Sequence, residues 1–487
     1  MLQIILRNIF YILFIIYFYK RTKHGLHMLQ LESYKNERYA KWMGQNKKGL
    51  YFGVPKAAAK KPFVVTNRIK RMYGTYLVLL MLLFVLGNLF PAIEWSLIVC
   101  ILFAIFSYNI VSVINIINSP IEKHIQKGFY KKAKKKLEEM PNLKVIGITG
   151  SYGKTSTKYI VSTILSQKYN VLMTPESFNT TMGVVRTINE KLNSTHNLFV
   201  CEMGAKQIGD IKEICDLVKP DLGILTAIGP QHLETFKTIE NVKKTKLELV
   251  DSLDENGIAF VNYDDKNILQ ADIKKSKCTY GMSREFDYYA DEVICNEKGS
   301  EFIVHCKSGK SINVRTKLLG MHNIENIVGA IAVADFLGLS EEEIVAGVRF
   351  LKPVPHRLEL LGKPDGSLII DDAYNSNSEG AKRALDVLKL FKGRKRILIT
   401  PGIVDLGEET EKYNSKFGMQ ATEVSDYIIL VGEKQAQAIL KGINETKYPK
   451  ESVYVAKDLN EALLRMQEIS DSNTVTLLEN DLPDNYL

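Results

Sequence analysis

A glycine-rich segment at residues 144–165, KVIGITGSYGKTSTKYIVSTIL, constrains the fold of this chain more than any other part of the sequence. An apolar run typical of a strand leads into Gly150 and Gly153, and a helix-forming stretch begins near Lys154. Glycines let backbone amides approach an anion closely, and a helix N-terminus attracts phosphate through its amides and dipole. Lys154 is placed to reach terminal phosphates, and Thr155 offers a hydroxyl to Mg²⁺. The segment therefore predicts a phosphate-binding loop.

The loop departs from the general G-x-x-x-x-G-K-[ST] spacing, because Ile148 stands where the first glycine would be. A bare G-K-T occurs often by chance, so the prediction depends on the complete strand–loop–helix context. A helix cap that binds nothing is the alternative. The loop alone leaves a kinase, a transport ATPase and a ligase all open.

Short apolar runs alternate with polar helical stretches from Leu143 onward, as in KVIGIT, NLFVCEM, DLGILTAI and GIAFVN. This alternation is typical of a mostly parallel sheet covered by helices. Residues 282–316 indicate hairpins, and a second α/β series begins near Leu368. With Pro353–Pro355 as linker, the pattern predicts an α/β fold: a mostly parallel P-loop-type ATPase domain over residues 126–352 and a smaller Rossmann-like domain over residues 353–487.

The first 125 residues contain long apolar runs. No charge occurs between Arg71 and Glu94, and none from Trp95 to Pro120. Each run is long enough for a membrane helix, which takes about 20 residues. An earlier apolar segment is interrupted by Arg7 and reads as a signal anchor. We therefore expect transmembrane helices near residues 3–20, 74–92 and 95–117; buried core helices are the alternative.

Basic residues flank these runs. Residues 21–71 contain many Lys and Arg but only Glu32 and Glu37 as acids, and a second basic cluster covers residues 131–136. By the positive-inside rule, residues 1–125 form a membrane region with a cytoplasmic loop at 21–71. The prediction is a multi-pass protein of the cell (inner) membrane with cytoplasmic catalytic domains. The net charge of +9 is then explained without a nucleic-acid partner. Six scattered cysteines without C-x-x-C spacing disfavour a zinc ribbon or disulfide framework.

Eight stretches in a fixed order carry a resemblance to a known family. TGSYGKTS, which contains Ser151 and Ser156, is similar to the phosphate loop of the Mur ligases, which add amino acids during peptidoglycan precursor synthesis. The others follow in the family's order: SFNTTMGV, CEMGAKQIGDI, TAIGPQHLETF, ENVKKTKLELV, GMHNIENIVGAIAVA, PVPHRLELL and IIDDAYNSNSEGAKRALDVL. The resemblance covers about residues 140–430. The nearest branch is the D-alanyl-D-alanine-adding enzyme.

The resemblance implies a magnesium site. Thr155 and Glu202 would bind the ion bridging the phosphates, and His232 matches the family's second magnesium ligand. Lys246 aligns with the lysine that the family carbamoylates into a metal-binding carboxylate, although Lys243 and Lys244 stand close by. A solvated carboxylate, a capping histidine and a surface lysine are the respective alternatives.

The resemblance also implies nucleotide contacts. Asn323 and Asn326, in G-M-H-N-I-E-N, match residues that hold adenine, with Asn323 the better candidate for the base; a polar helix N-terminus is the alternative. Arg357 and Asp372 would reach ATP from the last domain, because Arg357 can bind a phosphate oxygen pair and Asp372 can meet the ribose hydroxyls or a phosphate-bound water.

The implied substrate residues lie in two loops. Asn179 and Thr180 belong to the motif that resembles the family's substrate-side loop. Tyr374, Asn375 and Asn377 would face the incoming amine or its carboxylate, with turn-forming roles as the alternative.

Together these features predict an ATP- and Mg²⁺-dependent amide ligase of the acid–amino-acid type. A carboxylate is phosphorylated to an acyl phosphate, an amine displaces phosphate, and ADP is formed. Lys154, His232 and Lys246 are the expected catalytic residues, and the expected partners are carboxylate and amine substrates and the membrane.

Three departures bear on the substrate. Little chain separates the last apolar run from residue 144, where the family has a domain that binds uridine diphosphate. Ala227 replaces a usual Asn, and the C-terminus lacks a K-G-S-R-like ending. We therefore expect a membrane-associated, lipid-linked or polymeric glycan acceptor. A UDP-N-acetylmuramoyl-tripeptide–D-alanyl-D-alanine ligase with an anchor, and a membrane ATPase or nucleotide sensor, are the alternatives.

Overall fold

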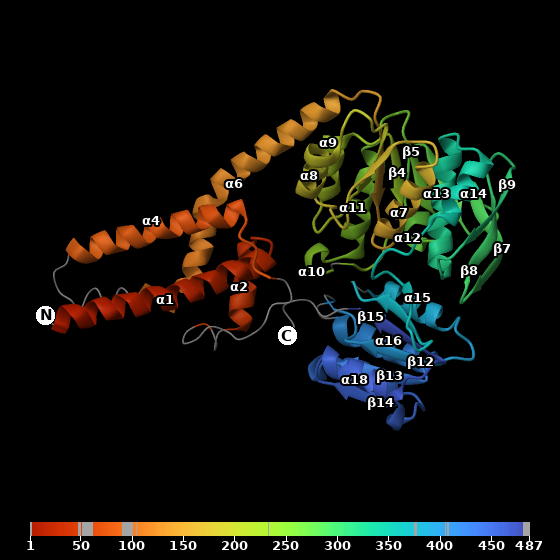
Figure 1. Cartoon of the computed structure of the whole chain (residues 1–487). Coiled ribbons are helices and arrows are strands. Elements are labelled where there is room, and N and C mark those ends of the chain that lie inside the picture. The colour runs from red at the N-terminus through yellow and green to blue at the C-terminus, as the bar shows by residue number, and fades with distance from the viewer. Residues whose placement is uncertain are drawn as a thin grey trace. The chain divides into compact units, whose positions relative to one another are not determined.

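The computed structural model describes residues 2–46, 50, 62–89, 101–103, 105–231, 233–374, 377–404, 406 and 409–480. The chain divides into two compact units, residues 1–128 with 482–487 and residues 129–481. The first unit is helical in its described residues, and the second is an α/β structure (Figure 1).

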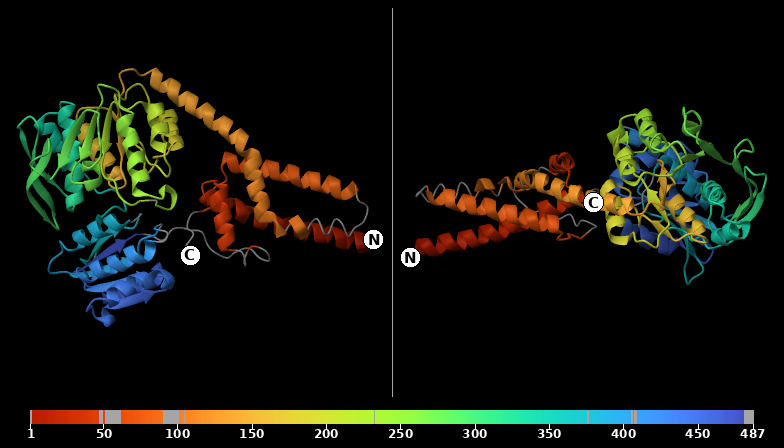
Figure 2. Two further views of the ribbon diagram at one scale, coloured as in Figure 1. Left: turned by 180° about the vertical axis from the view of Figure 1, so that it is seen from behind. Right: turned by 90° about the horizontal axis from the view of Figure 1, so that it is seen from above.

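The first unit is formed by long helices that pack through aromatic and aliphatic side chains. They are α1 (Leu2–Leu31), α2 (Asn36–Gln45), α4 (Asn67–Leu89) and α6 (Ser107–Glu138), the last of which continues into the second unit. Helices α1 and α4 lie side by side in both Figures 1 and 2. Phe18 of α1 stacks on Tyr76 of α4 with ring centroids 5.1 Å apart. Leu26, Ile69 and Val111 are fully buried between the helices.

Polar side chains also connect these helices. Arg21 Nε donates to Ser107 Oγ at 2.8 Å. The Arg71 guanidinium donates to both oxygens of Glu122, at 2.6 and 2.8 Å. Because a buried charge without a partner is costly, these pairings allow charged residues to lie inside the helical unit.

The structure corrects the membrane prediction. Within the described residues, no helix is long and apolar enough to cross a membrane. The predicted spans near residues 3–20, 74–92 and 95–117, and the predicted membrane location, are therefore wrong. The helices that contain these apolar runs also carry charged side chains, which pair inside the protein as described for Arg71 and Glu122. Residues 90–100 and 104, in the second and third predicted spans, lie outside the described residues.

The central domain, residues 144–349, contains a nine-stranded sheet of order β2-β3-β1-β4-β5-β6-β7-β8-β9. Strands β2 to β7 are parallel, and β7 to β9 form antiparallel hairpins that Figure 2 shows as a curved extension of the sheet. The bounds are β1 (Lys144–Thr149), β2 (Val171–Met173), β3 (Leu198–Glu202), β4 (Leu222–Leu225), β5 (Ile258–Asn262), β6 (Lys277–Gly281), β7 (Tyr288–Asn296), β8 (Gly299–His305) and β9 (Ser311–Thr316).

Helices cover both faces of this sheet (Figure 1). One face packs on α7 (Lys154–Leu165), α13 (Met321–Phe336) and α14 (Glu341–Arg349), and the other on α8 (Thr181–Lys191), α9 (Asp210–Val218) and α11 (Ile239–Asp251). Successive residues of β1 point to opposite faces, so Val145 belongs to one core and Ile146 to the other. Two short helices, α10 (Leu233–Phe236) and α12 (Lys266–Leu269), follow β4 and β5.

The C-terminal domain, residues 359–479, contains a six-stranded sheet of order β10-β11-β15-β12-β13-β14. All its strands are parallel except the edge strand β10. The strands are β10 (Glu359–Gly362), β11 (Leu368–Asp372), β12 (Lys395–Thr400), β13 (Tyr427–Val431), β14 (Val453–Ala456) and β15 (Thr474–Glu479). The helices are α15 (Ser378–Leu388), α16 (Thr410–Thr422), α17 (Glu433–Asn444), η2 (Lys450–Ser452) and α18 (Leu459–Ile469).

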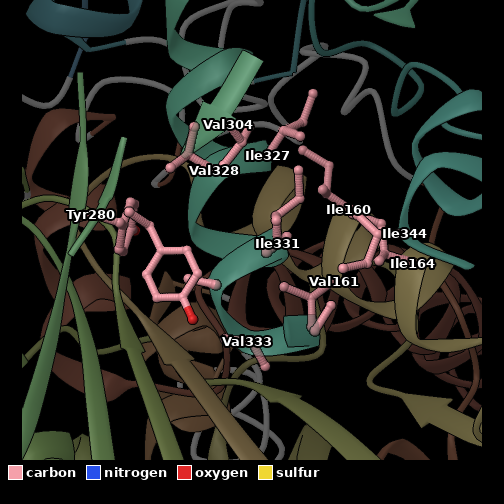
Figure 3. Packing of buried hydrophobic residues seen from close by; sticks show 14 of the residues in the cluster. Ile160, Val161, Ile164, Tyr280, Val304, Ile327, Val328, Ile331, Val333 and Ile344 are labelled. Atoms are coloured by element: carbon pink, nitrogen blue, oxygen red, sulfur yellow. The ribbon is translucent and has the colours of Figure 1, made fainter. Parts of the chain in front are cut away.

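The contact between α7 and α13 forms the core beneath the phosphate loop. Figure 3 shows Ile160 and Ile164 of α7 beside Ile327 and Ile331 of α13. Ile331 is completely buried. This packing fixes α7, whose first residue is Lys154.

We expect Ile331→Ala to lower the free energy of unfolding by about 2–5 kcal/mol, because the substitution leaves a cavity that the rigid helix pair cannot fill. Urea unfolding followed by circular dichroism measures the effect. Leu464→Ala in α18 is the control, because that side chain is 61% exposed; its effect should stay within about 0.5 kcal/mol. Equal effects of the two substitutions would contradict the packing described.

Candidate active site

The parallel pairing of β1 with β3 and β4 creates the site. Ile148 of β1 pairs with Glu202, the last residue of β3, and Thr149 pairs with Leu225, the last residue of β4. The carboxyl ends of the three strands therefore meet at one edge, where binding sites of such sheets lie.

The loop after β1 is fixed on the segment that follows β4. A Cβ atom on Gly150 would lie 2.1 Å from Thr226 Oγ1 and 2.9 Å from the Ala227 nitrogen, so only glycine fits there. The Ser151 amide donates to the Ala227 carbonyl at 2.7 Å. Gly153 has φ +78° immediately before α7, a conformation that glycine adopts without strain. These contacts hold the loop beneath the N-terminus of α7.

Lys154 begins α7 and folds back over the loop. Its Nζ donates to the carbonyl of Gly150 at 2.6 Å and to that of Ser151 at 3.2 Å. Burial, together with the charge of Arg357, lowers the pKa of Lys154 to about 8 against the opposing effect of Glu202. The ammonium group therefore lies in a desolvated position, where a bound anion would stabilise the charged form and raise the pKa of Lys154.

Glu202 is the buried carboxylate of the site, with 1% of its surface exposed. Thr155 Oγ1 donates to Glu202 Oε1 at 3.2 Å, and Asn179 Nδ2 donates to the same oxygen at 2.9 Å. Lys158 Nζ lies 3.0 Å from the other oxygen, Oε2. Burial by itself would raise the pKa of Glu202, but the ammonium groups of Lys158 and Lys154 and the Asn179 hydrogen bond lower it overall. Glu202 is therefore an ionised carboxylate at neutral pH.

Lys246 of α11 is a second buried lysine, 2% exposed. Among the interactions of the described residues, none is a hydrogen bond or ion pair of its ammonium group. Burial, together with the nearby Lys154, holds the pKa of Lys246 well below its ordinary value. Its amine is therefore readily deprotonated, unlike that of a surface lysine.

The donors near the loop fit a magnesium ion held jointly with phosphate. Thr155 and Glu202 offer hard oxygen ligands 3.2 Å apart, and Mg²⁺ is usually bound by one or two carboxylates together with substrate phosphates. In the described part of the chain there is no cluster of three His, Cys, Asp or Glu residues that could hold a metal by itself. His232, the predicted second ligand, lies outside the described residues.

The predicted adenine motif braces the loop and its helix. Asn326 Oδ1 accepts a hydrogen bond from Thr157 Oγ1 at 3.1 Å, and Asn323 Nδ2 donates to the Leu319 carbonyl at 2.8 Å. Both asparagines are at least nine-tenths buried. Their neighbour His322 is half-buried, and desolvation together with the charge of Arg383 lowers its pKa to about 3.

A cavity of about 620 Å³ adjoins the loop between the central and C-terminal domains. Its wall includes Tyr152 of the loop, Asp265 after β5, Glu325 of α13 and Arg383 of α15. Arg383 lies 3.5 Å from Glu325 and so joins the two domains across the cavity. Tyr152, Glu325 and Arg383 lie inside the quoted motifs but were not singled out. Asp265 lies outside them, although the Asp264–Asp265 pair shortly after an apolar strand was an available signal.

Residues of the C-terminal domain form a second cluster. The Arg357 guanidinium lies 4.4 Å from the centroid of the Tyr374 ring, and the Tyr374 hydroxyl is 2.7 Å from Ser177 Oγ in the predicted substrate-side loop. Burial and the neighbouring Glu479 raise the pKa of Asp372 to about 8, although Arg357 and the Leu358 amide oppose the shift. A carboxyl group that titrates near neutrality thus lies beside a permanently charged arginine.

Two predicted substrate residues act as helix caps. Thr180 accepts from the Gly183 amide at 3.3 Å at the start of α8, and Asn377 accepts from the Gly380 amide at 2.8 Å at the start of α15. Asn375 lies outside the described residues.

Two family models match this part of the chain: the Mur ligase middle domain at residues 148–334 and the Mur ligase glutamate ligase domain at residues 356–478. The chain carries two Mur ligase domains. The described elements before residue 144 are helices, and neither match extends into them.

Relatives and solved structures agree with this assignment. A UDP-N-acetylmuramoyl-tripeptide–D-alanyl-D-alanine ligase of Bacillus subtilis is 31% identical over 287 residues, which are 59% of this chain and 62% of that protein. The match thus spans less than two thirds of the relative. MurF from Acinetobacter baumannii has a TM-score of 0.66 at 27% identity, covering 74% of this chain and 78% of that one. MurF ligase from Thermotoga maritima, in complex with ADP, has a TM-score of 0.65 at 25% identity, covering 73% and 80%.

The lowered pKa of Lys154 predicts how anion binding depends on pH. Its pKa of about 8 means that the free Mur ligase site loses this positive charge as the pH rises above 8. We expect the affinity for pyrophosphate to fall above that pH, where Lys154 loses its charge. Lys154→Arg should flatten the profile, because arginine stays charged. Calorimetric titration at several pH values measures the affinity, and an unchanged affinity of the natural protein up to pH 10 would contradict the prediction.

Proposed function

We propose that this chain is an ATP-dependent ligase that joins a carboxylate to an amine and forms ADP and phosphate. The observation that supports the proposal best is the arrangement of Lys154, Thr155 and Glu202 at one sheet edge of a Mur ligase middle domain. The ADP complex of the similar Thermotoga maritima ligase supports a nucleotide at this loop.

The proposed reaction has two steps. A carboxylate oxygen of the first substrate attacks the terminal phosphorus of ATP, the bond to ADP breaks, and an acyl phosphate forms. The amine nitrogen of the second substrate then attacks the acyl carbon, loses a proton and displaces phosphate. The first step transfers a phosphoryl group between negatively charged oxygens, so the protein must neutralise charge at the phosphoryl group.

The chain's own residues supply the positions for this chemistry. The amides of Gly150 and of residues 152–154, together with the Lys154 ammonium, would hold the terminal phosphates. Thr155 and Glu202 would hold Mg²⁺, with Asn179 keeping the Glu202 carboxylate in place. Bound Mg²⁺ supplies positive charge to the transferring phosphoryl group.

The remaining parts of ATP have candidate positions as well. The cavity of about 620 Å³ beside Tyr152 and Glu325 lies within the range of small-molecule sites, about 300–1,000 Å³, and adjoins the phosphate loop. We assign the base and ribose to this side, where Asn323 and Asn326 fix the start of α13. Arg357 and Asp372 would approach the nucleotide from the C-terminal domain.

Lys246 is proposed to become a carbamate. Its buried amine is held toward the neutral form, and only a neutral amine can attack CO₂. The amine nitrogen bonds to the carbon of CO₂ and loses one proton, and the resulting carbamate would offer a metal-binding oxygen donor in place of the buried amine. His232 is proposed as a ligand of the same metal site, as the motif resemblance implies.

We expect Lys246→Arg to lose acceptor-dependent ADP formation, because arginine keeps the positive charge and forms no carbamate. Removing dissolved CO₂ should inactivate the natural protein reversibly, with bicarbonate restoring the activity. Lys243→Arg, on the same helix, is the matched control and should respond to CO₂ as the natural protein does. Full activity of the natural protein without CO₂ would contradict the carbamate.

Two acceptors are to be compared. The relatives favour UDP-N-acetylmuramoyl-tripeptide with D-alanyl-D-alanine. The described residues before β1 are helical rather than α/β, which favours an acceptor without the nucleotide sugar, such as a lipid-linked or polymeric envelope glycan. The ligase chemistry is common to both.

We expect ADP formation by the full chain to require both a carboxylate and an amine substrate, and to disappear in Lys154→Ala. An assay of ADP release with each acceptor class, with and without D-alanyl-D-alanine, measures this. Lys168→Ala is the control, since this exposed lysine lies beyond the end of α7. Hydrolysis of ATP at the same rate without any acceptor would favour an ATPase and overturn the ligase.

A further inference from the structure

Lys158 contacts the carboxylate of Glu202, and the mechanism above does not use this lysine. Lys158 lies one turn after Lys154 on α7, and its side chain is completely buried, as is that of Glu202. Its Nζ lies 3.0 Å from Glu202 Oε2. A lysine is rarely buried to this extent unless it is paired, so the Lys158–Glu202 pair is a specific arrangement of this site.

The two carboxylate oxygens of Glu202 have different partners. Lys158 occupies the side of Oε2, whereas Thr155 and Asn179 donate to Oε1. The carboxylate is therefore held from both sides and cannot rotate without losing the ion pair at Oε2 or the hydrogen bonds at Oε1. Oε1 is the oxygen that faces the hydroxyl proposed to share the metal ion.

Lys158 also reaches the loop at residues 174–180. Its Nζ donates to the Glu176 carbonyl. Glu176 has φ +43°, an unusual conformation for a residue with a side chain, so this carbonyl is oriented by the tertiary contact. Asn179 of the same loop donates to Glu202, and Ser177 contacts Tyr374 of the C-terminal domain. One ammonium group thus joins the carboxylate to the loop that approaches the C-terminal cluster.

We propose that Lys158 is a positioning residue that orients the metal-binding carboxylate of Glu202 and ties it to the loop at residues 174–180. This inference rests on the proposed function, because it takes Glu202 as a magnesium ligand. Lys158 itself touches neither nucleotide nor substrate. It acts through Glu202 and the Glu176 carbonyl.

Stability alone is a weak reason for this pair. Replacing a buried ion pair by apolar residues is often neutral or stabilising, because desolvation cancels much of the attraction. The ion pair does, however, fix the Glu202 carboxylate and the Lys158 ammonium group in one relative position. Partners in the outer shell of a metal site typically change metal affinity about 10- to 100-fold when they are removed.

The test is a calorimetric titration of the full chain with β,γ-imido-ATP, with and without Mg²⁺. We expect Lys158→Met to bind the nucleotide alone as the natural protein does, because Lys154 and the loop amides are unchanged. The strengthening of binding by Mg²⁺ should fall about 10- to 100-fold. Lys158→Arg keeps the charge and N–H donors and should restore part of it. Lys168→Met is the matched control and should match the natural protein.

Hydrogen exchange gives a second readout without catalysis. The amides of residues 174–180 should exchange faster in Lys158→Met than in the natural protein and Lys168→Met. If circular dichroism shows that Lys158→Met is unfolded, Lys158→Gln, which is neutral but polar, takes its place in both measurements with the same expectation.

Two results would overturn the inference. If Mg²⁺ strengthens nucleotide binding by Lys158→Met as much as by the natural protein, and the amides of residues 174–180 exchange at the natural rate, Lys158 is only structural. If Mg²⁺ strengthens binding more in the variant, Lys158 competes with the metal instead of positioning its ligand. Failure of the natural protein to bind the nucleotide at all would instead reject the proposed function.

Discussion

The parallel pairing of β1 with both β3 and β4 is the constraint on which the rest of the site depends. Because Ile148 pairs with Glu202 and Thr149 with Leu225, the three strands end together. The loop that carries Gly150 then meets Thr226, and α7 begins beside the Glu202 carboxylate. A slip of one residue in β1 would turn its side chains to the opposite faces of the sheet. It would exchange the two hydrophobic cores and separate the loop from the carboxylate.

This dependence explains why part of the site could be predicted from the sequence. The glycine loop is a local motif, and the rule that parallel strands present binding residues at their carboxyl ends places Glu202 beside it. Lys158 could not be found in this way, because a lysine four residues after Lys154 reads as an ordinary helical residue. Its burial arises from the loop at residues 174–180, which packs over it. Arg383 was equally hidden, because its contact with Glu325 forms only when two domains meet.

The first unit shows the opposite case, in which a local pattern misled. Uncharged runs of membrane length predicted spans, but hydropathy along the chain does not show which distant polar groups pair. Arg71 and Glu122 are far apart in sequence and bond at 2.6 Å, and Arg21 reaches Ser107. A helix that carries such groups can pack against other helices through mixed apolar and polar contacts. The length of an apolar run is therefore not enough to predict a membrane span. In the described structure, these helices pack against one another and pair their polar side chains.

Several lysines surround Glu202 in the second unit, and their charges link the stability of the fold to the binding of an anion. Lys158 and Lys246 are buried and Lys154 is half-buried, and among the described residues only Lys158 forms an ion pair with this carboxylate. Burial, and to a smaller extent the neighbouring positive charges, disfavours the charged forms of Lys154 and Lys246, and the lowered pKa values of the two lysines express that cost. A polyanion at the loop would return Lys154 to its fully charged form. Carbamoylation would remove the charge of Lys246. The electrostatics of the folded chain thus favour an anion at the loop and a Lys246 side chain without a positive charge.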